Sequence, residues 1–264
     1  MKYKGARIQV LDLPGIIEGA ADGRGRGRQV ISTARTCNLI LVVLDAGKPV
    51  THKKIIEAEL NSFGIRINQE PPDVKFVRRE KGGIGYQETV PQTRGMSREA
   101  AYVVCKEYRV SCAEIIIRED ITVDQFIDVI EGNRAYIPVL YVFNKIDAIT
   151  IEELDILDQM PNYVPISSQN NWNLEELMEE VWNRCSMIRI YTKPKGQAPD
   201  YDEPVIMHAE NPTIEEFCNR LHKGIMPQFS HALVWGRSAK HQPQTCGKEH
   251  VLCDEDIIQI CKKV

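Results

Sequence analysis

The chain has 264 residues, which is enough for one large domain or for two to three small ones. Hydrophobic residues make up 43% of it and charged residues 27%, as in a soluble globular protein with a substantial core. The formal net charge of −4 argues against nucleic-acid binding through bulk charge. We therefore predict no DNA-binding function, while a local basic patch stays compatible with this charge.

No apolar run approaches the roughly 18 residues that a membrane span needs. Residues 1–7 lack the apolar stretch of a signal peptide. The eight cysteines are scattered and form no Cys-x-x-Cys pair. These features predict reduced thiols in a cytoplasmic protein that makes no membrane contact.

Strands and helices alternate along most of the chain. The predicted strands are residues 8–11, 38–44, 139–143 and 163–166, and the predicted helices reach residue 35 and span 51–60, 151–157 and 173–185. The runs NLILVVL (38–44) and VLYVF (139–143) are continuously apolar, which is typical of strands buried on both faces. The alternation predicts an α/β fold, with a parallel sheet and helices on both of its faces.

Two segments interrupt this alternation. Residues 66–133 are too long for a loop and contain a predicted helix after Ser97, a strand at 113–118 and a helix at 122–131, so we predict an inserted α/β subdomain. After a turn at 193–200, strands at 205–208, 232–235 and 257–260 accompany a helix whose capping box runs from Thr213 to Glu216. This second segment predicts a small sheet packed on one helix.

The most informative motif, Asn144-Lys145-Ile146-Asp147, directly follows the apolar strand at 139–143. Guanine carries a ring N–H beside an exocyclic amino group, and the two oxygens of the Asp147 carboxylate can accept from both, which adenine cannot satisfy. Asn144 can bond the other edge of the base, and the alkyl stem of Lys145 can lie over its plane. The alternative is an ordinary polar turn, because these three residue types are common in turns.

Two weaker motifs follow other predicted strands. In Asp12-Leu13-Pro14-Gly15, the carboxylate of Asp12 can bind Mg²⁺ through water, and the Gly15 N–H can contact a γ-phosphate. In Ser167-Ser168-Gln169, a backbone N–H can donate to the guanine O6. The carboxyl ends of parallel strands meet at one edge of a sheet, so the three motifs together predict one nucleotide site there.

These motifs resemble the third, fourth and fifth guanine-nucleotide motifs of the developmentally regulated GTP-binding (DRG) family, within the Obg-related translation-factor class. The resemblance extends through residues 64–67, 81–84, 128–134, 190–196, 232–236 and 254–260, and so covers nearly the whole chain. It implies a partial P-loop-type G domain at residues 1–65 and 134–187. It also implies an inserted ribosomal-S5-like subdomain at 66–133 and a C-terminal β-grasp (TGS) domain at 188–264.

The phosphate loop of such a G domain, G-x-x-x-x-G-K-[S/T], is absent from the sequence. Gly47-Lys48 is followed by Pro49, and Gly247-Lys248 by Glu249. A strand–loop–helix unit needs about 30 residues, more than the eleven that precede Asp12. We therefore expect an N-terminally truncated G domain that retains the base-recognising half of its site and lacks the phosphate loop and switch I.

The resemblance implies a GTP-binding, ribosome-associated protein whose family hydrolyses GTP to GDP and phosphate, with Mg²⁺ and K⁺ as cofactors. Its implied partners are GTP, the ribosome or ribosomal RNA through the TGS domain, and a regulatory partner protein. Ile16 occupies the position where many related GTPases place a water-orienting glutamine, so catalytic residues stay unassigned. The alternative is a module that binds ribosomes, RNA or a partner protein without hydrolysing GTP.

Two further patterns stay open at this stage. The basic run Gly23-Arg24-Gly25-Arg26-Gly27-Arg28 predicts a switch-II loop whose arginines contact RNA or phosphate, or a solvated basic loop. A second group, His241, Cys246, His250 and Cys253, has a spacing that fits no standard zinc finger.

Overall fold

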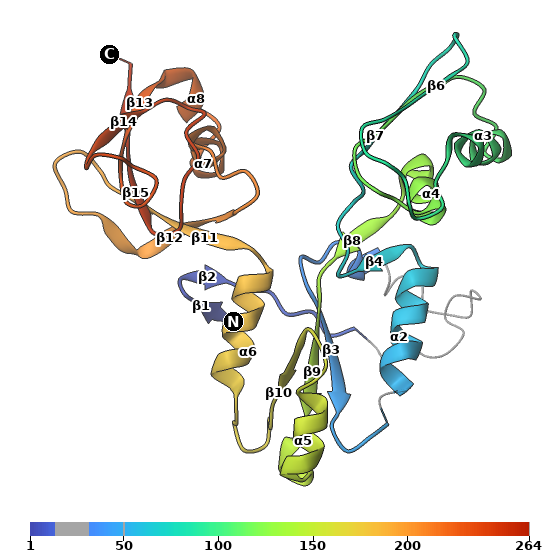
Figure 1. Cartoon of the computed structure of the whole chain (residues 1–264). Coiled ribbons are helices and arrows are strands. Elements are labelled where there is room, and N and C mark those ends of the chain that lie inside the picture. The colour runs from blue at the N-terminus through green and yellow to red at the C-terminus, as the bar shows by residue number, and fades with distance from the viewer. Residues whose placement is uncertain (14–31, 50, 264) are drawn as a thin grey trace. The chain divides into compact units, whose positions relative to one another are not determined.

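The structure is a computed structural model that describes residues 1–13, 32–49 and 51–263. It divides into two compact units. Unit 1 consists of Met1–Asp12, Asn144–Ala148 and Val164–Val264, and unit 2 of Leu13–Phe143 and Ile149–Tyr163. Figure 1 shows the elements of both units, which are described separately below.

The first part of unit 2 is an α/β core. It contains β3 (Ile40–Asp45) and β9 (Val139–Asn144), neighbours in a sheet whose order is β10-β9-β3, together with helices α2 (Thr51–Ser62) and α5 (Ile151–Leu157). Every residue of β9 up to Phe143 is buried, as its unbroken apolar run predicts. Burial ends at Asn144, so the polar motif that follows begins where the strand leaves the core.

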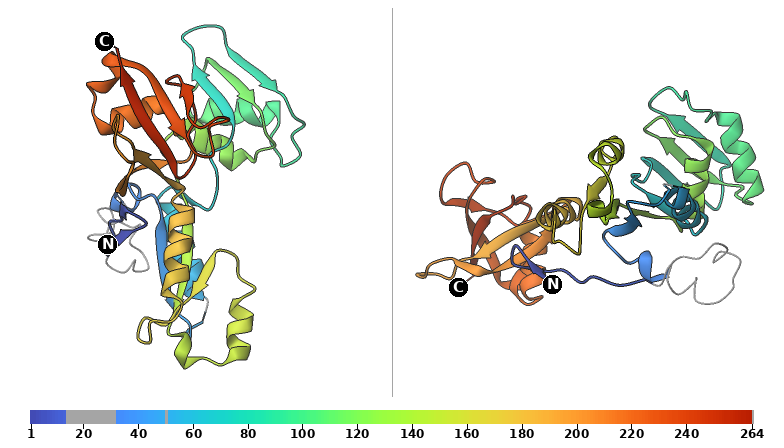
Figure 2. Two further views of the ribbon diagram at one scale, coloured as in Figure 1. Left: turned by 90° about the vertical axis from the view of Figure 1, so that its left-hand side faces the viewer. Right: turned by 90° about the horizontal axis from the view of Figure 1, so that it is seen from below.

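A second part of unit 2 is the inserted subdomain. Its sheet has the order β5 (Val74–Arg78), β7 (Ala113–Ile117), β6 (Ile84–Glu88), antiparallel on one side of β7 and parallel on the other. Helices α3 (Arg98–Glu107) and α4 (Val123–Glu131) pack on it around a core that includes Phe126. Figure 2 shows the subdomain from two further sides. It has its own hydrophobic core, as a domain requires.

The sequence signals for these helices are confirmed by their caps. The Ser97 and Thr122 side chains accept hydrogen bonds from the first turns of α3 and α4, and Gly132 ends α4 in the left-handed conformation. The subdomain is joined to the α/β core through β4 (Ile65–Ile67) and β8 (Ala135–Ile137), which pair in parallel. The two connecting segments therefore leave the core side by side.

Most of unit 1 is a sheet covered by helices. Its order is β12 (Asp200–His208), β11 (Met187–Thr192), β15 (Asp256–Lys262), β13 (Phe229–Trp235), β14 (Gln244–Cys246). Helices α7 (Ile214–Leu221) and α8 (Ile225–Gln228) accompany it, and Phe217 of α7 is fully buried in the shared core. β11 pairs with β15 in parallel, whereas its pairing with β12 is antiparallel. The sequence predicts β12, β13, β15 and α7 of this helix-backed sheet, but not β11, β14 or α8.

The rest of unit 1 supplies the candidate site. It comprises the hairpin β1 (Lys2–Tyr3) and β2 (Ala6–Arg7), the 3-10 turn η2 (Ile146–Ala148) and helix α6 (Leu174–Arg184). Strand β10 (Tyr163–Pro165) lies at the division between the two units, since unit 1 resumes at Val164.

Two sequence predictions are wrong in detail. Residues 8–11 do not form a strand; β1 and β2 pair with each other instead, and Val10 and Leu11 are exposed without a described neighbouring strand. The capping box at Thr213 is only half formed. Its side chain accepts from the Glu216 N–H, but the Thr213 N–H donates to Asn211 and the Glu216 carboxylate pairs with Arg220.

The helix predicted to reach residue 35 is helical at 32–34, and its beginning lies outside the described residues. The remaining predicted helices and strands are present, with boundaries shifted by a few residues. Within the described residues, no helix is both long and apolar enough to cross a membrane.

Candidate functional site

The Asp147 carboxylate is exposed, and a neighbouring side chain holds one of its oxygens. Asp147 lies in η2, just after β9, and its Oδ1 accepts a hydrogen bond from the Ser167 hydroxyl. Ser167 is fully buried, and its Oγ also accepts from the Asn170 N–H at 3.2 Å. The carboxylate is thus oriented from one side and can still accept two donors of a ligand from the other.

Asn144 ties the turn after β9 to the loop after β10. Its Oδ1 accepts from the Lys145 N–H at 2.8 Å and from the Ser168 N–H at 3.0 Å, and its Nδ2 donates to the Ser168 Oγ at 3.0 Å. The Ile146 N–H donates to the Ile166 carbonyl at 3.2 Å between the same segments. The structure therefore brings together Asn144, Lys145, Asp147, Ser167 and Ser168, as the sequence predicts for one site.

The loop after β10 is closed by backbone hydrogen bonds. Ser167 and Trp172 exchange N–H···O bonds of 3.2 and 3.0 Å, and the Asn173 amide donates to the Pro165 carbonyl at 3.0 Å. Asn173 adopts the left-handed conformation and precedes α6 without a side-chain cap of its own. The Asn173 side-chain amide closes the loop instead of capping the helix. Its position directly before a predicted helix does not indicate this role.

The backbone N–H groups of Ser167-Ser168-Gln169, one of which is predicted to donate to the guanine O6, differ in whether they are already hydrogen-bonded. Ser168 N–H is bonded to Asn144, and Ser167 N–H to Trp172. The next N–H along, that of Gln169, has no partner among the described residues and is exposed. The backbone of Gln169 can therefore donate to a ligand without breaking a hydrogen bond between described residues.

Lys145 sits in the left-handed region, with φ of 68°. The conformation is costly for a residue with a Cβ and is typical of functional turns. Here the hydrogen bond from the Lys145 N–H to the Asn144 side chain stabilises it. It leaves the long, exposed Lys145 side chain at the same turn as Asp147.

The phosphate side of the predicted site is only partly described. Asp12 is exposed and hydrogen-bonds with no other described residue. Gly15, Ile16 and the basic run at 23–28 lie outside the described residues. The structure accordingly places the predicted base-recognising residues but not the complete phosphate side.

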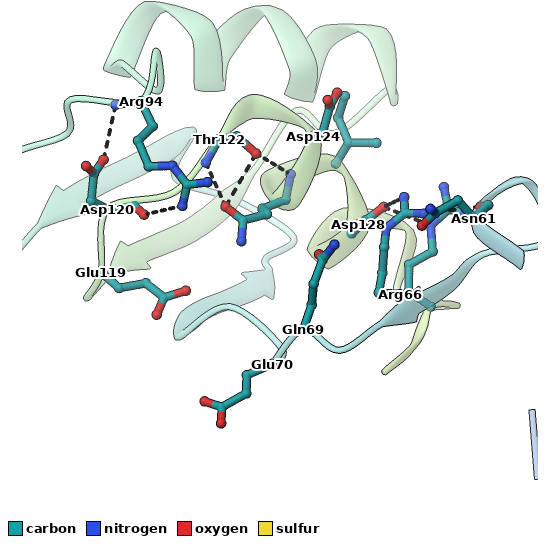
Figure 3. Close-up of a pocket in the computed structure, with 13 residues that line it drawn as sticks. Asn61, Arg66, Gln69, Glu70, Arg94, Glu119, Asp120, Thr122, Asp124 and Asp128 are labelled. Atoms are coloured by element: carbon teal, nitrogen blue, oxygen red, sulfur yellow. Dashed lines mark hydrogen bonds and ion pairs between the residues drawn. The ribbon is translucent and has the colours of Figure 1, made fainter. Parts of the chain in front are cut away.

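A large cavity lies elsewhere, within unit 2. It has a volume of about 880 Å³, and its lining is predominantly polar and charged (Figure 3). The lining residues are Asn61, Arg66, Gln69, Glu70, Arg94, Glu119, Asp120, Thr122, Asp124, Gln125, Ile127, Asp128 and Arg134. None of the predicted nucleotide residues is among them.

Buried ion pairs occupy one side of this cavity. The Asp128 carboxylate, only 5% exposed, accepts from Arg66 Nε at 2.6 Å and from Arg134 Nε at 2.8 Å (Figure 3). These hydrogen bonds with Asp128 raise the pKa of Arg66 above its usual value, although burial opposes the shift. Arg66 lies in β4 and Arg134 immediately before β8, so Asp128 of α4 connects the subdomain to both of its linking strands. This arrangement indicates a structural role.

The cysteines and histidines give no metal site among the described residues. Cys246 is buried in the sheet core, where burial raises the pKa of its thiol. His250 Nε2 lies 2.9 Å from the Ser238 hydroxyl, and the Cys253 N–H donates to Asp256. These groups make protein contacts of their own.

Three family models match consecutive parts of the chain. Residues 1–77 match the model described as "50S ribosome-binding GTPase", and residues 81–187 match "C-terminal region of MMR_HSR1 domain". Residues 188–262 match the TGS domain. With the fold, these matches define a protein of the GTPase class that carries a C-terminal TGS domain.

Curated relatives narrow the class. A "Developmentally-regulated GTP-binding protein 1 homolog" from Dictyostelium discoideum is 60% identical over 100% of this chain and 72% of that protein. "Developmentally-regulated GTP-binding protein 1" of Xenopus laevis is 55% identical over 100% of this chain and 71% of its own length. "Ribosome-interacting GTPase 1" of Saccharomyces cerevisiae is 53% identical with the same coverage. The chain belongs to the developmentally regulated GTP-binding protein family.

A solved structure, a GTP binding protein from Pyrococcus horikoshii OT3, aligns over 87% of this chain and 80% of that one. Its 13% identity and TM-score of 0.47 are too low to support an argument about this protein. The family assignment rests on the curated relatives.

Proposed function

We propose that this protein binds guanine nucleotides and selects the base through Asp147. The observation that carries the proposal is the exposed Asp147 carboxylate, oriented by the buried Ser167 hydroxyl at the end of β9. Two oxygens of one carboxylate match the adjacent N–H donors of guanine, and adenine offers no such pair. A site that hydrogen-bonds specific donors discriminates strongly against a ligand that lacks them.

The neighbouring residues complete the base site. Asn144 keeps the two loops together and faces the other edge of the base, and the alkyl stem of Lys145 covers its plane. Ser167 orients Asp147. Ser168 anchors Asn144. The Gln169 N–H donates to the guanine O6.

On the phosphate side, we assign Asp12 to Mg²⁺ through a bound water and Gly15 to the γ-phosphate. The Asp12 carboxylate, which is exposed and bonds with no other described residue, fits this role, since Mg²⁺ prefers oxygen ligands and retains several waters. The Asp12 carboxylate supplies only one of the ligand groups that a Mg²⁺ site needs. A bound Mg²⁺ would neutralise charge on the phosphates. K⁺ is proposed as a second cation beside the phosphates.

GTP hydrolysis to GDP and phosphate is the reaction proposed for a complete site. The 264 residues contain no G-x-x-x-x-G-K-[S/T] sequence, so turnover requires phosphate-binding groups from outside them. No residue of this chain is assigned as catalytic. Base recognition, by contrast, needs only residues that the structure describes.

The missing motif favours a second candidate function, a non-hydrolysing module that binds ribosomes or RNA through the TGS domain at 188–264. The yeast relative's name, "Ribosome-interacting GTPase 1", supports ribosome association, and a cytoplasmic location and a regulatory partner protein are proposed with it. The same three domains are proposed for either function. They are the partial G domain at 1–65 and 134–187, the inserted subdomain at 66–133, and the TGS domain at 188–264. Co-sedimentation with ribosomes that is unchanged by guanine nucleotides supports the second function over the first.

The base assignment is tested by Asp147→Asn, because an amide can donate to the second carbonyl of xanthine. We expect GDP affinity to fall roughly 100-fold, the loss of two charged hydrogen bonds, and xanthosine diphosphate affinity to rise. Displacement of a fluorescent nucleotide measures both constants. Asp155→Asn, which changes an exposed carboxylate of α5, is the matched control. Unchanged preference for GDP in Asp147→Asn removes Asp147 from the proposal.

A further inference from the structure

Two cations contact the ring of Trp182, a residue of α6 that is 5% exposed. Lys4 Nζ lies 5.7 Å from the ring centroid, and Arg189 Cζ also lies 5.7 Å from it. Both distances are within the range of an attractive cation–π contact, which is stronger where water is excluded. Lys4, Trp182 and Arg189 together are called the Trp182 cluster.

Lys4 connects the cluster to the N-terminal hairpin. Its Nζ lies 2.7 Å from the Glu179 carboxylate of α6, and the Tyr3 hydroxyl donates to the same carboxylate at 2.8 Å. Hydrogen bonds from Lys4 and Tyr3 lower the pKa of Glu179. In the turn of the hairpin, a Cβ on Gly5 would lie 2.5 Å from Pro204 of β12. The hairpin therefore touches both α6 and the TGS sheet.

Arg189 connects the cluster to the turn before β15. It lies in β11, and its guanidinium pairs at 2.8 Å with Asp254 and at 2.8 Å with Glu255, in the turn before β15. The backbone reinforces the link, because the Arg189 N–H donates to the Asp254 carboxylate at 2.7 Å. Asp254 has a lowered pKa because its hydrogen bonds with Arg189 outweigh the effect of burial.

Two chain segments of the candidate nucleotide site continue directly into elements that carry the Trp182 cluster. The hairpin continues directly through residues 8–11 to Asp12. Helix α6 begins immediately after the loop at 167–172, whose closing bridge joins Ser167 and Trp172. The chain thus links Asp12 to the hairpin that carries Lys4, and the loop at 167–172 to the helix that carries Trp182.

From this convergence we infer that the Trp182 cluster couples occupancy of the nucleotide site to the TGS domain. The inference rests on the proposed function, since it requires a nucleotide at Asp12 and Asp147. Packed side chains that join two sites carry coupling when a ligand favours one of their arrangements. Coupling of this kind is reciprocal, so a partner that binds the TGS domain changes nucleotide affinity by the same factor.

Hydrogen–deuterium exchange of the whole chain, with and without GDP, tests the coupling at residues 253–258. We expect saturating GDP to slow exchange there roughly fivefold or more. Lys4→Gln and Arg189→Gln should abolish this protection. Arg189→Lys, which retains the positive charge but lacks the planar guanidinium group, should reduce it. Exchange without GDP reports whether each variant is folded.

The controls are Lys2→Gln in the same hairpin and Lys248→Gln in the TGS domain, whose pair with Glu215 is exposed. Both should retain the full protection. Equal protection in Arg189→Lys, Lys4→Gln and wild type overturns the inference. So does a wild type that is saturated with GDP and shows no change at 253–258. A wild type that displaces no fluorescent nucleotide contradicts the proposed function itself, so the two failures are distinguishable.

Discussion

The two sides of the candidate nucleotide site differ in how their carboxylates are held. On the base side, Asp147 is oriented by a buried hydroxyl, and Asn144 fastens the turn to the neighbouring loop. On the phosphate side, Asp12 is exposed and has no described partner. The difference teaches that contacts between two loops orient the carboxylate of Asp147, whereas no described residue orients that of Asp12.

A third carboxylate, Asp128, extends the comparison because it serves stability. It is buried between Arg66 and Arg134, and removing one partner of a buried ion pair leaves uncompensated charge. We expect Asp128→Ala to lower the free energy of unfolding by about 3 kcal/mol. Chemical denaturation measures this loss.

The control for Asp128 is Asp73→Ala. Asp73 pairs with Arg118 at 3.3 Å, and both side chains are at least half exposed. Its loss should cost less than about 0.5 kcal/mol. Similar losses in the two variants would show that Asp128 is not a structural anchor of the subdomain.

Ser167→Ala tests whether the base side is preorganised. Without the hydroxyl, the Asp147 carboxylate loses its internal donor, so we expect roughly tenfold weaker GDP binding, about the value of one charged hydrogen bond. Ser168→Ala leaves the backbone N–H that bonds Asn144 and should have a smaller effect. Nucleotide displacement separates the two, and a larger loss in Ser168→Ala would contradict the role given to Ser167.

The pH dependence of stability sharpens the comparison for Asp254, which is held by Arg189. Its pKa is lowered in the folded state, so the associated stability is present above the unfolded value of 3.8 and is lost as pH falls through the lower folded value. The effect should be less than about 1 kcal/mol. Unfolding midpoints measured down to about pH 3 should fall less steeply in Arg189→Gln than in wild type. Identical slopes would contradict the pairing.

The smallest expected effect is that of Asp12→Asn on stability. An exposed carboxylate without a described partner should change the free energy of unfolding by no more than about 0.5 kcal/mol. The same substitution should remove any Mg²⁺ dependence of nucleotide binding. Denaturation and titration with and without Mg²⁺ check both parts, and Mg²⁺ dependence that survives the substitution would exclude Asp12 as the Mg²⁺ residue.

The sequence predicted helices and strands best where a single local pattern was enough to determine the structure. The unbroken apolar run of β9 and the caps Ser97, Thr122 and Gly132 correspond to observed elements, because an apolar run or a cap can be read from neighbouring residues alone. Residues 8–11 are also mostly apolar, but a strand needs a neighbour for its hydrogen bonds, which no local pattern reports. The same limit explains the half-formed capping box at Thr213, where the Glu216 carboxylate pairs with Arg220.

The loops after β9 and β10, which carry the proposed base-recognising residues, were also only partly predictable from the sequence. The types and order of Asn144, Asp147 and Ser167 indicated which residues come together. The sequence did not indicate that the Asn144 side chain accepts a hydrogen bond from the Ser168 N–H. Which donor is occupied depends on the relative position of two loops whose bonded residues, Asn144 and Ser168, are 24 positions apart in the chain.

Calorimetric titration of the purified chain with GTP and with ATP, in the presence of Mg²⁺ and K⁺, tests base recognition most directly. The account predicts saturable GTP binding and no ATP binding, because the proposed base site pairs the Asp147 carboxylate with the two adjacent donors of guanine, which adenine lacks. Equal binding of the two nucleotides would contradict the assignment of Asp147. Absence of any binding would contradict the claim that base recognition needs only the described residues.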